Sequence, residues 1–186
     1  MKRLLTVGLA IALIGCRDQR IIQPTLALPR PGTPVPTFAF AMRDSGQLRS
    51  SDLTGRPTVL FLWSTHCPTS RRALAGYREI QRVYSLRGVR VVMLSDDESS
   101  AEMALLPKVL VDSNIVGELA LARGKLASVF DRSASAPERD TARVEFVLPA
   151  YLVIDPAGKV AGRSWGPDAQ YVRVILDSLL ASRPAA

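Results

Sequence analysis

The pattern of apolar and polar positions divides the chain into three parts. Residues 4–14 are a continuous apolar run, and residues 17–36 contain five prolines without periodic hydrophobicity. From about residue 37 to residue 184, strand-like and helix-like patterns alternate. We therefore expect a leader at residues 1–15, an extended tether at residues 16–36 and one folded domain over residues 37–184.

Inside the domain, short apolar runs alternate with stretches whose apolar residues recur every three to four positions. This alternation predicts an α/β fold, with a central mixed sheet flanked by helices and an N-terminal hairpin. The expected strands are residues 38–42, 47–49, 58–63, 89–94, 108–112, 146–154 and 159–163. The expected helices are residues 68–86, 100–106, 116–126 and 168–181. Residues 131–143 and the acidic run at residues 96–98 are polar and aperiodic, which predicts solvated surface loops.

The leader carries a targeting signal. Lys2 and Arg3 precede the apolar run, which is shorter than the roughly 20 residues that cross a bilayer and is typical of a signal peptide. The run ends in Leu-Ile-Gly followed by Cys16, which resembles the lipobox of bacterial lipoproteins. This resemblance implies that Cys16 is lipidated and holds the protein on a membrane of the cell envelope, facing the periplasm or another extracytoplasmic space. The alternative is an ordinary signal peptide with an incidental cysteine.

Composition narrows the function classes. The chain has 186 residues, of which 47% are hydrophobic and 22% charged, as is typical of a globular protein. The net charge is +7, but the basic residues are scattered and form no stripe with aromatic residues, so we expect no nucleic-acid partner. There are two cysteines. Lipidation of Cys16 therefore leaves Cys67 as the one free thiol and excludes an internal disulfide.

The chemistry of the chain centres on Cys67, which lies where an apolar strand gives way to a helix beginning with Pro68. A sulfur at a helix N-terminus faces unpaired N–H groups and the positive end of the helix dipole, and both favour the thiolate. His66, the one histidine of the chain, is suited to stabilise a thiolate or to relay a proton. The alternatives are a buried inert thiol at Cys67 and an exposed loop side chain at His66.

Three segments resemble one family. Residues 63–70, WSTHCPTS, resemble the Trp-Ala-Thr-Trp-Cys-Pro-Pro-Cys motif of TlpA-like redoxins, which are periplasmic or membrane-anchored thioredoxin-related proteins. Residues 53–57 are similar to the lead-in of that motif, and residues 148–160 to the cis-proline strand and hairpin of the family. The resemblance covers about residues 37–182 and implies a thioredoxin fold. We expect no cofactor and no metal: Cys67 and His66 alone make a thin copper site without a second cysteine, and an acidic run such as residues 96–98 is usually solvated.

The resemblance also assigns a substrate site. Pro149 is expected to be a cis-proline facing the sulfur of Cys67, and Leu148 to offer its backbone to an extended substrate strand. Trp63, as a core residue or as part of the site wall, and Pro68 complete the expected substrate-binding set.

Two positions depart from the family pattern. Ser70 stands where the family has its resolving cysteine, and Phe61 where thioredoxins carry a buried aspartate that assists proton transfer. A serine is able to hydrogen-bond the thiolate of Cys67 but not to break a mixed disulfide. We therefore expect a monothiol–disulfide oxidoreductase whose partners are protein or low-molecular-weight thiols and disulfides, with an external reductant.

Two other functions stay open. In the first, Cys67 is a peroxidatic cysteine, because the Cys-Pro-Thr stretch resembles that of some peroxiredoxins and Ser64 lies where they have threonine or serine. Leu60, however, stands where those proteins have a proline. In the second, turnover is lost, and the domain binds clients through Cys67 and the groove beside Pro149.

Overall fold

A computed structural model describes residues 28–130 and 148–182 of the chain. Its seven strands form one mixed sheet in the order β2-β1-β5-β4-β3-β6-β7. The strands are β1 (Ala39–Met42), β2 (Gln47–Arg49), β3 (Thr58–Trp63), β4 (Arg90–Ser95), β5 (Glu118–Leu121), β6 (Ala150–Ile154) and β7 (Val160–Trp165). The α-helices are α1 (Pro68–Tyr84), α2 (Ser100–Asp112), α3 (Leu126–Phe130) and α4 (Gln170–Ala181), and two short 3₁₀ helices are η1 (Ser50–Leu53) and η2 (Ser85–Arg87). The predicted α/β class, with a central mixed sheet and an N-terminal hairpin, is confirmed.

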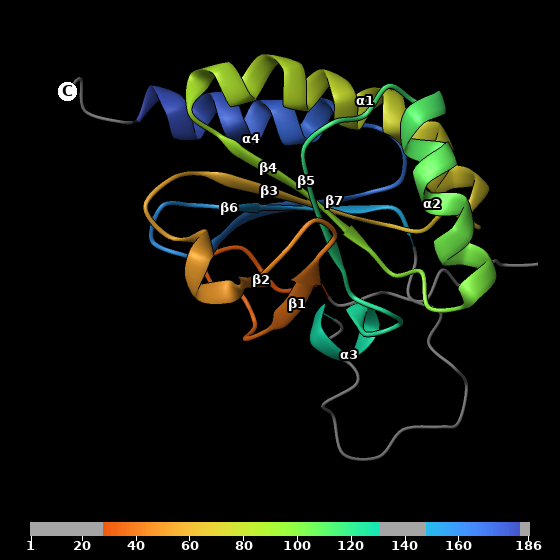
Figure 1. Ribbon diagram of the computed structural model, residues 1–186. Helices are drawn as coiled ribbons and strands as arrows, with labels where there is room; N and C mark the ends of the chain where they lie inside the picture. The colour runs from red at the N-terminus through yellow and green to blue at the C-terminus, as the bar shows by residue number, and fades with distance from the viewer. Residues whose placement is uncertain (1–27, 131–147, 183–186) are drawn as a thin grey trace, which may run out of the picture.

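The central strand β3 positions the site. It pairs in parallel with β4 and antiparallel with β6, and all six of its residues are buried, as its apolar sequence predicts. Its side chains alternate between two apolar clusters, one on each face of the sheet. Helices α1 and α4 lie together over one face, and α3 lies beyond the other face near the twisted β1–β2 hairpin (Figure 1).

Two predictions in the middle of the chain are wrong. A single helix, α2, spans the residues where the sequence predicts a helix to 106 and a strand from 108. Pro107 and the β-branched residues after it favour a break, but Leu106 and Leu110 lie one helical turn apart and both are buried in the core. The helix predicted at residues 116–126 is strand β5 followed by α3. β5 forms because it pairs with β4 and β1, which are far away in the sequence.

The folded region begins before residue 37, where the sequence places its start. Leu28 is buried, and the chain after it runs beside β7. The Gly32 N–H donates to the Val160 carbonyl, and the Val35 N–H to the Gly158 carbonyl. Residues 28–36 therefore pack against the domain. The predicted leader, Cys16 and the loop predicted at residues 131–143 lie outside the described residues.

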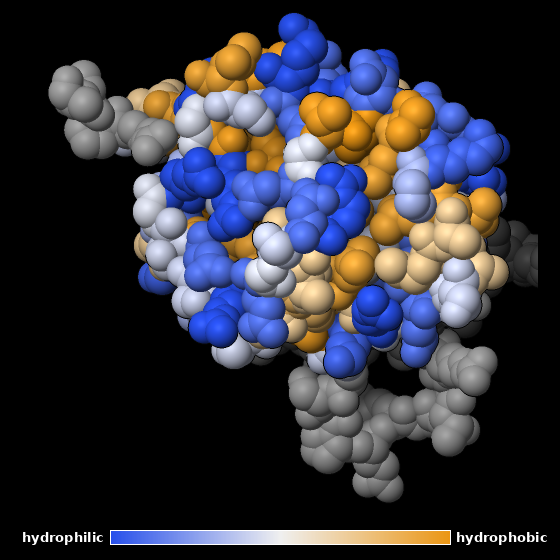
Figure 2. All heavy atoms as spheres, viewed as in Figure 1, coloured by the Kyte–Doolittle hydropathy of each residue, from blue (hydrophilic) through white to orange (hydrophobic). Residues whose placement is uncertain are grey.

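Apolar and charged side chains are mixed on the surface that Figure 2 shows. Large exposed apolar residues include Leu105 and Val111 of α2 and Val174 of α4. Single exposed apolar residues are normal on protein surfaces. Within residues 28–130 and 148–182, no helix combines the length and the apolar character that a membrane crossing requires.

Candidate functional site

Cys67 caps the N-terminus of α1 directly after the loop that leaves β3. Pro68 takes the first helical position, where a missing N–H group costs no hydrogen bond. The sulfur of Cys67 accepts a hydrogen bond from the Ser70 backbone N–H at 3.4 Å. The thiol in turn donates to the Leu148 carbonyl oxygen at 3.5 Å. Cys67 as a residue is partly exposed.

The peptide bond between Leu148 and Pro149 is cis, as predicted. Pro149 is buried directly before β6, and the antiparallel pairing of β6 with β3 places Ala150 opposite Leu62. Because the end of β3 leads to Cys67, this register brings the Leu148 carbonyl to the sulfur. The structure therefore brings together the cysteine and the cis-proline segment that the sequence places 81 residues apart.

Ser70 lies behind the sulfur, one helical turn into α1. It is fully buried, and its hydroxyl oxygen accepts a hydrogen bond from the Ser64 N–H at 3.4 Å. The sequence allows the hydroxyl group to hydrogen-bond the thiolate. In the structure the contact with Cys67 comes instead from the Ser70 backbone N–H. The side chain ties the start of α1 to the end of β3.

Trp63 is a core residue, and its complete burial excludes direct contact with a substrate. Its ring is stacked on that of Phe61, which also packs against Tyr77 and Tyr151 at centroid distances of 5.1 and 4.7 Å. Burial raises the pKa of both tyrosines far above neutral, so their phenols stay protonated. This cluster of four aromatic side chains therefore provides no group that exchanges protons near neutral pH.

Asp97 is a site residue that the sequence analysis missed. The prediction of a solvated acidic loop is wrong for it, because its side chain is fully buried. One carboxylate oxygen accepts hydrogen bonds from the N–H and the hydroxyl of Thr65 at 2.8 and 2.9 Å. The other accepts from the Ser95 hydroxyl at 2.7 Å. Asp97 thus fixes the backbone two residues before Cys67.

His66 is paired with a second carboxylate. Its Nδ1 lies 2.9 Å from Oε1 of Glu102 and 3.8 Å from Oδ1 of Asp97, while 61% of the side chain is exposed. The other oxygen of Glu102 accepts the backbone N–H groups of Glu98 and Ser99, both at 2.9 Å, in the capping box of α2. These two hydrogen bonds, with a smaller contribution from His66, hold the pKa of Glu102 below its usual range.

The same three side chains resemble a metal site in spacing. One nitrogen of His66 and carboxylate oxygens of Asp97 and Glu102 lie within 4.8 Å of one another. Asp97 is already engaged by Thr65 and Ser95, and Nδ1 of His66 by Glu102. A hydrogen-bonded network accounts for the cluster, and we assign no metal to it.

Trp165 lies at the end of β7, beside the cis-proline segment, and the sequence analysis did not predict it as a site residue. It pairs in register with Ala150, and the N–H of the following Gly166 donates to the Pro149 carbonyl at 2.9 Å. Its side chain is 39% exposed, with the Arg163 guanidinium 5.2 Å from the ring centroid. The sequence signal for Trp165 was an aromatic residue after the strand that pairs with the cis-proline strand.

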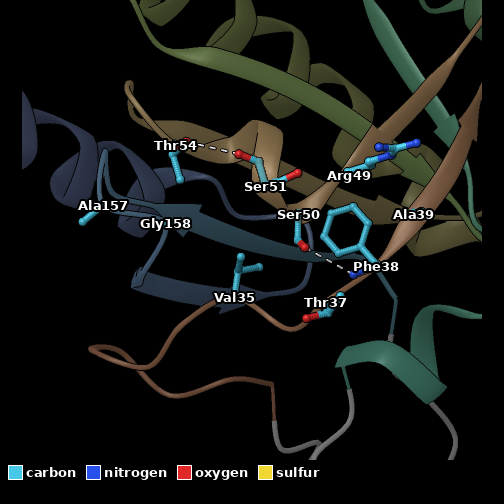
Figure 3. A pocket seen from close by; sticks show the side chains of 10 residues that line it. All are labelled: Val35, Thr37, Phe38, Ala39, Arg49, Ser50, Ser51, Thr54, Ala157 and Gly158. Atoms are coloured by element: carbon cyan, nitrogen blue, oxygen red, sulfur yellow. Dashed lines mark hydrogen bonds between the residues drawn. The ribbon is translucent and has the colours of Figure 1, made fainter.

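A shallow hollow lies at the other end of β3 (Figure 3). It has a volume of about 620 Å³ and is lined by Val35, Thr37, Phe38, Ala39, Arg49, Ser50, Ser51, Thr54, Ala157 and Gly158. Thr54 and Gly158 lie near the start of β3, roughly 17 Å along the strand from the Cys67 loop. None of the predicted site residues lines this hollow.

The sheet order, the cysteine at the start of α1 and the cis-proline beside it define a thioredoxin fold. Residues 31–163 match the model of the AhpC/TSA family, and the chain belongs to that family. The predicted relation to thioredoxin-like redoxins is confirmed. None of the curated proteins compared with the sequence matches it.

Solved structures share the fold at low sequence identity. A thiol:disulfide interchange protein of the thioredoxin family from Chlorobium tepidum TLS has a TM-score of 0.58 and 23% identity, over 82% of this chain and 98% of its own. A DsbF homologue from Corynebacterium diphtheriae has a TM-score of 0.61 and 19% identity, over 78% and 86%. StoA from Bacillus subtilis has a TM-score of 0.56 and 13% identity, over 76% and 96%. Likeness at these identities establishes the fold.

Proposed function

We propose that this protein is an exported monothiol–disulfide oxidoreductase, held on a membrane of the cell envelope through lipid on Cys16. Cys67 forms mixed disulfides with protein or low-molecular-weight partners, and an external thiol resolves them. One observation carries the proposal: a partly exposed cysteine caps α1 beside a cis-proline, and a buried serine follows it one turn later. Membership of the AhpC/TSA family and the fold shared with the thiol:disulfide interchange protein from Chlorobium tepidum support this chemistry.

The reaction has two steps. The Cys67 thiolate attacks one sulfur of a substrate disulfide, a bond forms between them, and the other sulfur leaves as a thiolate. An external thiolate then attacks the mixed disulfide and releases Cys67 as a thiolate. Ser70 has no sulfur for the second attack, so the chain stops at the mixed disulfide until that thiol arrives. The substrate disulfide is reduced and the external thiol is oxidised.

The contacts of Leu148 suggest how a client docks. In the resting protein its carbonyl oxygen accepts a hydrogen bond from the Cys67 thiol. Once the thiol ionises, that oxygen loses its donor and becomes free to accept a backbone N–H from an extended client strand. In the proposal, Pro68 and the exposed part of Trp165 border the client, Pro149 holds the Leu148 carbonyl in place, and His66 serves the proton transfers.

Peroxide reduction is the alternative that the family name raises. Leu60 argues against it, because it stands where peroxiredoxins with a similar Cys-Pro-Thr stretch have a proline. Ser64, which lies where they have threonine or serine, is fully buried. Thiol–disulfide exchange makes no demand on Ser64.

The experiment that tests the proposal is intact-mass analysis of the purified protein after incubation with bis(2-hydroxyethyl) disulfide. We expect one hydroxyethylthio adduct per chain, located on Cys67 by peptide mapping. Cys67→Ser should form no adduct, and the matched control Cys16→Ser should form it as the unaltered chain does. Failure of Cys67 to form the adduct, with rapid Cys67-dependent consumption of hydrogen peroxide, would contradict the proposal and favour the peroxidase.

A further inference from the structure

Disulfide exchange at Cys67 creates a need for a proton carrier. In the first step a substrate sulfur leaves as a thiolate, and in the second an incoming thiol must lose its proton. A carrier that serves both steps has to gain and lose a proton near neutral pH, which is the property of histidine among unperturbed side chains. β3 contributes no titratable side chain, and burial keeps Tyr77 and Tyr151 protonated. His66 is the one histidine of the chain and adjoins Cys67.

The structure holds His66 by one ring nitrogen. Nδ1 is 2.9 Å from Oε1 of Glu102, so Nε2 remains for proton exchange, and the 61% exposure of the side chain leaves it open to a substrate. The second oxygen of Glu102 is held in turn by two backbone N–H groups at the start of α2. A base oriented by a fixed carboxylate is the arrangement found where histidine transfers protons in catalysis.

Asp97 fixes the backbone that carries the imidazole. Its buried carboxylate binds the N–H and the hydroxyl of Thr65, the residue before His66, and lies 3.8 Å from Nδ1. The carboxylates of Glu102 and Asp97 lie near the imidazole, and that of Asp96 interacts with it at longer range. The protonated ring is the form that donates to a leaving thiolate, and the neutral ring is the form that accepts a proton from an incoming thiol.

We propose that Glu102 and Asp97 are positioning residues that hold His66 as the proton carrier for disulfide exchange at Cys67. The inference rests on the proposed function. In the first step the Cys67 thiolate forms a bond with one substrate sulfur, and the leaving sulfur takes the proton from Nε2 of the imidazolium. In the second step the incoming thiol gives its proton to the neutral imidazole, its thiolate forms the new disulfide, and Cys67 leaves as a thiolate. The ring returns to its protonated form.

The test compares two disulfides in single-turnover reactions with the purified protein. The leaving group of bis(2-hydroxyethyl) disulfide is a strongly basic alkyl thiolate that gains from a proton. The leaving group of 5,5′-dithiobis(2-nitrobenzoate) is a weakly basic aromatic thiolate that leaves without one. We expect His66→Ala to slow the alkyl reaction on the order of a hundredfold and Glu102→Gln about tenfold. Both variants should react with the aromatic disulfide within about twofold of the unaltered rate.

The variants separate proton transfer from a structural role. Glu102→Gln keeps an acceptor for the capping box, so α2 retains its start while His66 loses its charged partner. Glu98→Gln is the matched control, because it also removes one negative charge. The Glu98 side chain lies against Gly124. The rates of this variant with both disulfides should equal those of the unaltered chain. Equal slowing with both disulfides, or no slowing with either, overturns the inference while the proposed function stands. An unaltered protein that forms no Cys67 adduct with either reagent overturns the proposed function and this inference with it.

Discussion

The buried carboxylate of Asp97 supports the loop that carries Cys67, and its removal should destabilise the protein strongly. Three donors depend on it: the Thr65 N–H at 2.8 Å, the Thr65 hydroxyl at 2.9 Å and the Ser95 hydroxyl at 2.7 Å. Asp97→Ala leaves all three without this acceptor in a fully buried place. A buried group that loses its partner costs about 1–3 kcal/mol, and the two hydroxyls are able to rotate toward other acceptors. We expect a loss of about 3 kcal/mol in the free energy of unfolding.

Asp97→Asn should cost less, about 1 kcal/mol, because its amide oxygen still accepts from Thr65 and its amide group is able to donate to the Ser95 hydroxyl. Asp44→Ala is the surface control, since Asp44 pairs with Arg43 in solvent and its loss should leave stability unchanged within error. Urea unfolding followed by circular dichroism measures all three variants. A loss of less than about 1 kcal/mol for Asp97→Ala would refute this reasoning.

Three further predictions concern the second thiol, pH and the sheet. Ser70→Cys should form an internal disulfide with Cys67 and release a bound client without added thiol; intact-mass analysis checks this, and a persistent adduct would contradict it. Burial raises the pKa of Asp96, a hydrogen bond from the Leu126 N–H opposes this shift, and neighbouring carboxylates add a smaller rise. The stability that this group contributes is fully present below its unfolded pKa and is lost as pH rises through the higher folded pKa. Asp96→Asn should therefore unfold at higher urea than the unaltered chain at pH 7 and show a smaller fall in stability with pH, whereas lower stability at pH 7 would refute this. Arg90→Ala breaks a two-oxygen contact with Glu118 across β4 and β5, and urea unfolding should show a loss of about 1–2 kcal/mol; no loss would show that solvent replaces the contact.

The sequence predicts elements well where local pattern and burial agree. β3 is apolar at every position because both of its faces are covered, and α1 begins at Pro68 because proline suits a first turn. β5 shows the limit of local pattern. Its four residues, ELAL, do not predict a strand by themselves. They form one because their backbone groups hydrogen-bond those of β4.

The residues of the site also differ in whether the sequence alone reveals them. Cys67 and the cis-proline are visible as motifs, because each residue has a chemical role that few others fill. Asp97 and Glu102 are not, since an aspartate and a glutamate in an acidic stretch look solvated until the chain folds. Their roles depend on where Thr65 and His66 are placed by β3, which the sequence does not show.

The lifetime of the mixed disulfide at Cys67 tests the central claim most directly. The hydroxyethylthio adduct is formed, free reagent is removed, and the adducted fraction is followed by intact-mass analysis before and after addition of glutathione. We predict an adduct that persists without thiol, because Ser70 provides no resolving sulfur, and that disappears once glutathione is added. Release of the adduct in the absence of any added thiol would contradict the monothiol mechanism.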